Sequence, residues 1–256
     1  MKRDAIIVAI LWAALTVVGG WLALSVNLLP VQGAEESAVI DEAFYLLLLL
    51  AVPVAALVLA MLIYSVVRFR SNDDSEEGPP LRNNRPIAWV WFLASTALAI
   101  FIVFNPGVKG IRELTANPNA DLVVKIEGSQ WHWKVSYPQY DLTYDQALQM
   151  ALPVDTRVKF EITSRDVLHS VWIPAVRLKM DAVPGKVTEM IFTPTQVGDY
   201  ESDPTWRVQC AELCGTGHAR MQMAVRVLEP QEFEEWIAEA KEQVGMSEMA
   251  GMSNME

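Results

Sequence analysis

Four residues with metal-binding side chains lie close together in one short stretch of the chain. Cys210, Cys214, His218 and Met221 follow one another at spacings of four, four and three, and they include both cysteines of the protein. Thiolates and imidazole nitrogens favour copper, zinc or iron, and an added thioether shifts this preference towards copper. The stretch therefore predicts a copper site that carries electrons.

The two cysteines also allow a simpler interpretation, a disulfide bond in an oxidising compartment. A disulfide would leave His218 and Met221 without a role, so the ordered donor set favours a metal. A mononuclear blue-copper site uses two histidines, one cysteine and a weak axial methionine. The additional thiolate allows a second arrangement, in which both cysteines bridge two copper ions and each ion has one imidazole.

The second imidazole must come from another part of the chain. His169 is the better candidate, because it opens a strand-like run and follows Ser-Arg-Asp-Val-Leu. His132 lies between Trp131 and Trp133, without other ligand-type residues beside it. We therefore expect His169 to complete the donor set.

The residues from 107 to 228 are expected to form the scaffold of this site. They contain short runs of alternating, β-branched and aromatic residues separated by Gly, Pro, Asn and Asp, which is typical of strands and turns. These runs are Leu122–Glu127, Gln130–Tyr137, Arg157–Thr163, Leu168–Ile173, Val187–Thr193, Trp206–Gln209 and Met221–Leu228. The pattern predicts a β-sandwich or a Greek-key barrel.

Residues 1–106 are expected to anchor this domain in a membrane. The uncharged runs 5–29, 44–67 and 87–104 each approach the ~20 residues that a membrane-spanning helix needs. Basic residues precede the first run and flank the connection between the second and third runs, whereas the connection between the first two has none. The positive-inside rule therefore places the N-terminus in the cytoplasm and the copper domain outside. An Asn-Pro-Gly sequence at 105–107 predicts the exit from the membrane.

The first apolar run has a second interpretation, a cleavable signal peptide. Lys2 and Arg3, the apolar run and the sequence ending at Ala34 have the general form of such a signal. The run is long for a signal core, so we expect it to be retained as a third span. The predicted fold class is then membrane-anchored α+β, with transmembrane helices, an exported β domain and a C-terminal helix.

Residues 229–256 are expected to form a helix followed by a tail. Pro230 opens the run 231–243, in which four apolar residues share one helical face. They are Phe233, Trp236, Ile237 and Ala240. From Gly245 onward the chain is rich in methionine, and we expect a disordered tail, with transient Cu(I) capture as the alternative.

The net charge of −11 is unevenly distributed along the chain. Residues 107–228 carry fourteen acidic and thirteen basic side chains, whereas residues from 229 onward carry eight acidic side chains and one lysine. The expected copper domain is therefore close to neutral. It has no basic patch, which argues against nucleic-acid binding.

Three sequence blocks resemble subunit II of haem–copper cytochrome c oxidases. They are Gly128–Trp133, Asp166–Ser170 with Leu178–Gly185, and Gln209–Met221. The blocks follow the expected spans in the family's order, and the resemblance covers nearly the whole chain from the second span onward. It implies that the exported domain is a cupredoxin-like Greek-key β-barrel or sandwich, and that its site is the binuclear copper centre called CuA.

The resemblance also implies roles for individual residues. The side-chain ligands of the two copper ions would be His169, Cys210, Cys214, His218 and Met221. Glu212 matches the residue whose backbone carbonyl completes the copper set, and whose carboxylate reaches a magnesium ion at the boundary with subunit I. Trp131 matches the tryptophan through which electrons arrive from cytochrome c.

The implied function is that of the electron-transfer subunit of a respiratory terminal oxidase. It would accept electrons from cytochrome c or a small blue-copper donor and pass them to haem in subunit I, where oxygen is reduced to water. No catalytic residue for oxygen reduction is expected in this chain. Its expected partners are subunit I and the other oxidase subunits, in a bacterial-type plasma membrane with the copper domain on the outer, periplasmic face. The alternatives are the CuA subunit of a nitric oxide reductase-type enzyme and, in another class, a membrane-tethered copper carrier.

Overall fold

The computed structural model describes residues 2–70 and 84–253, and the chain forms two compact units. The first unit comprises Met1–Leu29 and Asp41–Glu113, and the second comprises Pro30–Ile40 and Leu114–Glu256. The second unit therefore contains a segment from the connection between the first two apolar runs.

Long apolar helices make up the first unit. They are α1 (Lys2–Ser25), α2 (Glu35–Arg68, whose first turns belong to the second unit) and α3 (Arg85–Ile102), continued by η1 (Val103–Val108) and α4 (Lys109–Leu114). Among the described residues, three helical stretches are long and apolar enough to cross a membrane: Arg3–Ser25, Glu35–Arg68 and Arg85–Leu114. This finding confirms the three predicted apolar helices and fits a membrane protein.

The third helical stretch continues past the predicted exit at Asn105-Pro-Gly. Asn105 has a non-helical backbone, with φ −141° and ψ 107°. A residue before proline is pushed out of the α region, so the kink at Asn105 follows from Pro106. Because proline is tolerated in the first turn of a helix, helical structure resumes and ends at Leu114.

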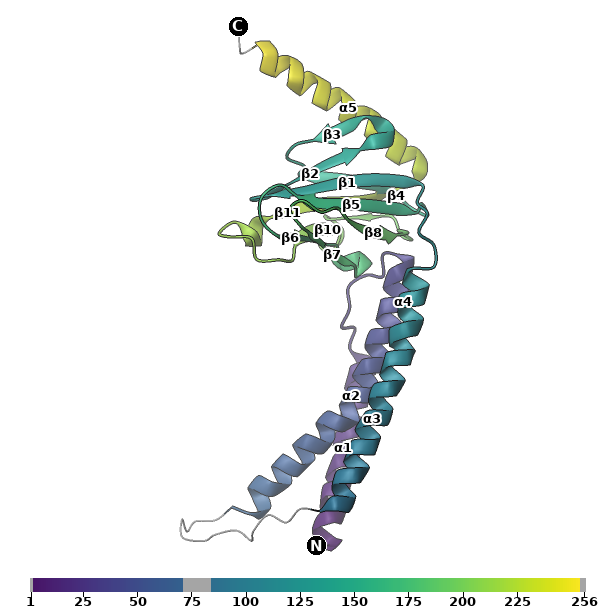
Figure 1. The fold of residues 1–256 in the computed structure, drawn as a ribbon, viewed down its shortest axis with the longest axis vertical. Helices are drawn as coiled ribbons and strands as arrows, with labels where there is room; N and C mark the ends of the chain where they lie inside the picture. Colours follow the sequence, from purple (N-terminus) through teal and green to yellow (C-terminus); the bar gives the residue numbers. More distant parts are fainter. Residues whose placement is uncertain (1, 71–83, 254–256) are drawn as a thin grey trace. The chain divides into compact units, whose positions relative to one another are not determined.

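Two β-sheets form the second unit (Figure 1). One has the order β3-β2-β1-β5-β8. Its strands are β3 (Leu142–Tyr144), β2 (His132–Tyr137), β1 (Leu122–Ser129), β5 (Val158–Ser164) and β8 (Thr188–Phe192). The other has the order β4-β11-β10-β6-β7, with β9 paired to β11. Its strands are β4 (Gln149–Pro153), β11 (Gln222–Leu228), β10 (Arg207–Cys210), β6 (His169–Trp172), β7 (Lys179–Ala182) and β9 (Gly198–Asp199).

The seven predicted strand runs are confirmed, and the core explains why they were recognisable. Along β1, Leu122, Val124 and Ile126 are buried and alternate with more accessible residues. Such alternation turns one face of a sheet towards the other sheet. Phe160 of β5 and Phe192 of β8 meet in this core with ring centroids 5.0 Å apart.

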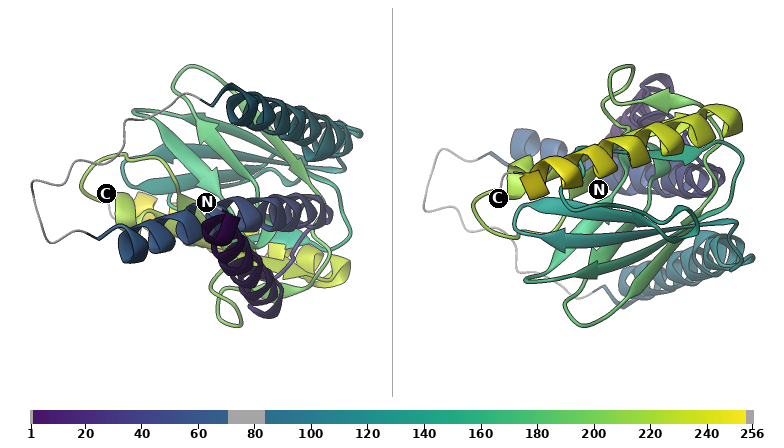
Figure 2. Two further views of the ribbon diagram at one scale, coloured as in Figure 1. Left: turned by 90° about the horizontal axis from the view of Figure 1, so that it is seen from below. Right: turned by 90° about the horizontal axis from the view of Figure 1, so that it is seen from above.

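The C-terminal helix α5 (Pro230–Ser253) lies beside the strands, as the right-hand view of Figure 2 shows. The predicted apolar face is buried, and the Trp236 ring lies 5.9 Å from that of Tyr137 in β2. The helix continues beyond the predicted end at Gln243, so the methionine-rich segment is helical up to Ser253. Ala, Glu and Met in this segment are good helix formers.

Residues Pro30–Ile40, called the strap below, are built into the β domain. The Gly33 N–H donates to the Ala175 carbonyl (2.9 Å), and Ala34 forms an isolated β-bridge with Pro194. A side chain at position 33 would overlap the indole of Trp206, so glycine allows this close approach. The strap is therefore a structural part of the domain that holds the candidate site.

Candidate metal centre

Three connections between strands come together around the cysteines. They are the turn after β1, the loop between β5 and β6, and the segment between β10 and β11. The Asp166 carboxylate accepts the Gln130 N–H at 2.7 Å, and the Gln130 side-chain amide donates to the Cys214 carbonyl at 2.8 Å. These bonds fix the three connections to one another.

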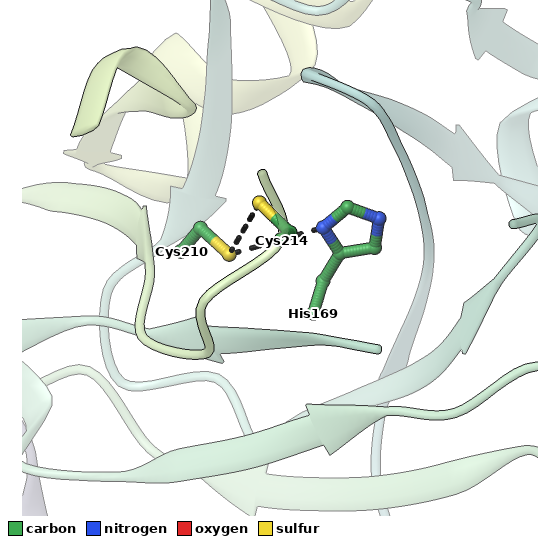
Figure 3. Close-up of side chains that lie close together, drawn as sticks. All are labelled: His169, Cys210 and Cys214. Carbon is green, nitrogen blue, oxygen red and sulfur yellow. Dashed lines mark hydrogen bonds between the residues drawn. The ribbon is translucent and has the colours of Figure 1, made fainter. Parts of the chain in front are cut away.

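The two thiols and one imidazole lie within metal-binding distance of one another (Figure 3). The Sγ atoms of Cys210 and Cys214 are 3.7 Å apart, and His169 Nδ1 lies 3.9 Å from Cys210 Sγ. All three residues are buried. His169 comes from the start of β6, and β6 pairs with β10, which ends at Cys210.

The remaining donors lie around the same pair of sulfurs. His218 Nδ1 is 3.7 Å and Met221 Sδ 3.8 Å from Cys214 Sγ. The backbone carbonyl oxygen of Glu212 lies 3.2 Å from Cys210 Sγ. The five side chains and the carbonyl singled out in the sequence are thus brought together, with one imidazole beside each thiol.

The donor spacings fit metal coordination. Metal–sulfur bonds of ~2.3 Å and metal–nitrogen bonds of ~2.0 Å around a tetrahedral ion put neighbouring donors roughly 3.5–3.8 Å apart. A disulfide needs its sulfurs at ~2.05 Å, and both cysteines are free. Two thiols, two imidazoles and a thioether lie in one cluster, in which His218 is half-buried and the other four side chains are buried. This set matches the preferences of copper better than those of zinc.

Burial also affects the proton on the Cys214 thiol. Desolvation, reinforced by the neighbouring Cys210 thiol, raises the pKa of the Cys214 thiol to about 12. The metal-free chain therefore holds a neutral thiol at this position at neutral pH. Because metals bind the thiolate, metal binding releases this proton.

Trp131 and Glu212 are both exposed beside the cluster. Trp131 is 41% exposed, and its indole N–H donates to the Cys214 carbonyl at 3.1 Å. The Glu212 side chain is exposed, although its backbone carbonyl faces Cys210. Hence the Trp131 indole reaches from the surface to the backbone of Cys214, and the Glu212 carboxylate is accessible to a hard cation.

The structure also places residues near the centre to which the sequence assigned no role. His169 Nε2 lies 2.8 Å from Asp166 Oδ1, and Gln130 binds the Cys214 carbonyl. Partial burial opposes ionisation of Asp166, but its bonds to His169 and to the N–H groups of Gln130 and Val167 prevail and lower its pKa to about 2. A carboxylate three residues before a candidate ligand histidine was the available signal, because such carboxylates often orient the imidazole.

A β-sandwich with a cysteine- and histidine-rich cluster, attached to apolar helices, defines a membrane-anchored metalloprotein. Comparison with known proteins identifies the family. A sequence profile described as "Cytochrome C oxidase subunit II, periplasmic domain" matches residues 122–228. The cytochrome c oxidase subunit 2 of Branchiostoma floridae is 30% identical over 175 residues, which cover 61% of this chain and 73% of that protein. The chain belongs to the cytochrome c oxidase subunit II family.

Other relatives extend this likeness along the chain. The cytochrome c oxidase subunit 2 of Synechocystis sp. is 25% identical over 91% of this chain and 82% of its own length. Among solved structures, the periplasmic domain of subunit II of cytochrome oxidase (CoxB) of Bradyrhizobium japonicum is 34% identical, over 49% of this chain and 97% of that one, with a TM-score of 0.45. As a member of the subunit II family, the chain is an electron-transfer subunit of an oxidoreductase complex. Members of this family carry a copper centre and assemble with other oxidase subunits.

Proposed function

We propose that this chain receives electrons for a respiratory terminal oxidase at a binuclear CuA centre. The observation that carries the proposal is the donor cluster, in which each of two adjacent thiols has its own imidazole at 3.7–3.9 Å. One tetrahedral ion takes about four ligands, so a set of five side chains and a carbonyl suits two ions. When bound, copper supplies reversible one-electron chemistry.

The ligands would be the residues found around the two sulfurs. They are the side chains of His169, Cys210, Cys214, His218 and Met221 and the backbone carbonyl of Glu212. The chain holds these groups in a rigid β scaffold and excludes water from the thiols, both of which are buried. A rigid scaffold would limit how far these groups move when the bound metal changes its oxidation state, which favours fast electron transfer.

Trp131 is proposed as the residue through which electrons arrive. It combines an exposed indole with a hydrogen bond to a ligand residue, Cys214. The donor is proposed to be cytochrome c or a small blue-copper protein, and the acceptor haem in subunit I. Electrons received by haem in subunit I would reduce oxygen to water.

Glu212 is proposed to reach a magnesium ion shared with subunit I. Its exposed carboxylate is a hard oxygen ligand, the type that Mg²⁺ prefers. Mg²⁺ is usually held by one or two carboxylates together with other ligands, so the remaining ligands would come from subunit I and water.

Copper stoichiometry and electron paramagnetic resonance of the full-length chain in detergent test the binuclear centre. We expect two copper ions per chain and a hyperfine pattern from one unpaired electron shared by two copper nuclei. His169→Gln should lower the copper count, whereas the matched variant His132→Gln should keep both ions. One copper per wild-type chain, or a disulfide and no copper, would exclude the proposal.

A further inference from the structure

The carboxylate of Asp166 has a separate partner for each of its oxygens. Oδ1 lies 2.8 Å from Nε2 of His169 and also accepts the Val167 N–H at 2.7 Å. Oδ2 accepts the backbone N–H of Gln130 at 2.7 Å. One side chain thus joins the loop before β6 to the turn that follows β1.

The bond to His169 determines which ring nitrogen faces the thiols. Imidazole has two nitrogens, and the one that donates a proton to a carboxylate cannot bind a metal. With Nε2 directed at Asp166, Nδ1 is directed at Cys210 Sγ, 3.9 Å away. The ring is fully buried, so Asp166 replaces the water that would otherwise satisfy Nε2.

The bond to Gln130 holds the turn that carries Trp131. This turn is fixed at its backbone by Asp166 and at its side chains by the Cys214 carbonyl, which accepts from Gln130 Nε2 at 2.8 Å and from Trp131 Nε1 at 3.1 Å. If Asp166 is lost, the turn loses its backbone bond to the loop before β6 and keeps the bonds to the Cys214 carbonyl and the pairing of Ser129 with His132.

We propose that Asp166 is a positioning residue with two functions. It directs Nδ1 of His169 towards the thiols, and it holds the turn that places Trp131 against the loop from Cys210 to Met221. This inference rests on the proposed function only in naming His169 a ligand and Trp131 the residue that receives electrons. The bonds themselves form in the chain without metal, so the ligand and the electron-receiving residue are set together before copper binds.

Proton exchange in the metal-free, thiol-reduced full-length chain in lipid nanodiscs tests the proposal without copper. Histidine-selective and tryptophan-selective ¹⁵N labels report the ring N–H of His169, one of only three histidines, and the indole N–H of Trp131. In Asp166→Ala we expect the His169 ring proton to exchange at least about tenfold faster, the factor expected when a hydrogen bond to a charged group is lost. The Trp131 indole proton should also exchange faster than in wild type, because its turn is held less firmly against the Cys214 carbonyl. Asp166→Asn retains one acceptor oxygen and should lie between wild type and Asp166→Ala.

Asp199→Ala is the matched control. The Asp199 carboxylate also accepts a loop N–H, that of Ser202 at 2.8 Å. Asp199 lies opposite Arg226 in the pairing of β9 with β11, towards the end of β11 that is far from Met221. This variant should leave both ring protons as in wild type. Unchanged exchange in Asp166→Ala would overturn the proposal, and a change at His169 alone would overturn the function assigned towards Trp131. Loss of the near-ultraviolet circular dichroism signal in both Asp166 variants would also overturn the proposal, because Asp166 would then support the fold as a whole.

Copper affinity provides a second measurement on the same variants. Loss of a carboxylate that orients a ligand histidine typically costs about 10- to 100-fold in metal affinity, so competition with a chelator should show this loss for Asp166→Ala and none for Asp199→Ala. Wild-type affinity in Asp166→Ala would contradict the positioning of His169. A copper count of one would end the binuclear proposal but would leave the proton-exchange result intact, so the two failures are distinguishable.

Discussion

The indole of Trp131 extends from the protein surface to the backbone of a cysteine in the candidate centre. It is 41% exposed and donates to the Cys214 carbonyl. The ring lies directly over Gly217, where a Cβ atom would overlap it. The absence of a side chain at position 217 therefore determines how closely the indole approaches the loop.

Replacing Gly217 with alanine should displace the Trp131 ring and slow electron uptake. Small displacements of a reacting group can cost about 10- to 100-fold in rate, and we expect a loss in that range. Trp131→Phe should slow uptake as well, since it removes the indole N–H. The measurement is stopped-flow reduction of the copper-loaded chain by reduced cytochrome c, with the copper absorption spectrum recorded for each variant.

Gly245→Ala is the control for the glycine substitution, because a Cβ atom there has nothing within 4 Å. It should reduce at the wild-type rate. If Gly217→Ala or Trp131→Phe instead abolishes the copper spectrum, these residues support the structure of the loop from Cys210 to Met221. Trp131 would then be a packing residue and not the residue that receives electrons.

The strap illustrates how an element far away in the sequence completes the domain. Arg157 donates to Glu36 Oε1 at 2.8 Å and to Thr193 Oγ1 at 3.0 Å, while the Thr193 N–H donates to Glu36 Oε2. The ion pair is well buried, with side chains 14% and 6% exposed. Arg177 adds bonds to the carbonyls of Pro30 and Val31.

Breaking the buried pair should destabilise the β domain. Glu36→Gln removes the charge that compensates Arg157, and loss of one partner of a buried pair typically costs about 3–5 kcal/mol. The measurement is thermal unfolding of the full-length chain in detergent, followed by near-ultraviolet circular dichroism. Glu189→Gln is the control: its side chain is 56% exposed in a surface pair with Lys159, so a change of ~0–1 kcal/mol is expected. Equal stability of the two variants would contradict a structural role for the strap.

The strap constrains how the full-length chain can cross the membrane. The strap and the β domain form one compact unit, so both must lie on one side. The chain between them must then cross an even number of times, which α2 and the α3–α4 stretch provide. A further crossing by α1 would put the N-terminus on the side opposite the β domain, and the basic residues identify that side as the cytoplasm.

We therefore predict an N-terminus in the cytoplasm that stays attached to the mature chain. Cleavage after Ala34 would remove Gly33 and Val31, which bind the β domain. A fluorescent protein fused to the N-terminus should fluoresce and remain on the same polypeptide as a C-terminal alkaline phosphatase, which should be active outside. A mature chain that begins at Glu35, or a dark N-terminal fusion, would refute the prediction.

Local sequence patterns predicted most of the fold and which residues of the loop from Cys210 to Met221 lie together in the donor cluster. Alternation revealed strands such as β1 and β5, and donor spacing revealed the loop from Cys210 to Met221, because both signals lie within a few residues. Strands of two or three residues, such as β9 (Gly198–Asp199) and β3 (Leu142–Tyr144), are too short to produce such a pattern. The kink at Asn105 was recognisable as a break, but the helix after it was not.

Contacts that depend on strand register could not be predicted. β1 and β5 pair in parallel with Gly128 opposite Ser164, and this pairing brings the turn at Gln130 next to Asp166. Nothing local to either segment specifies that register. The same holds for the strap, whose position depends on residues more than a hundred positions later in the chain.

The strap also imposes an order on the folding of the chain during synthesis. Glu36 and its partner Arg157 are 121 residues apart. At roughly 5–20 residues per second, Arg157 is synthesised about 6–24 s after Glu36. During that interval the strap has no surface to bind, and two membrane helices are inserted before its partner strands exist. The strap can therefore dock only after Arg157, Ala175 and Thr193 have been made, so an early-made segment of the domain waits for partners that are synthesised much later.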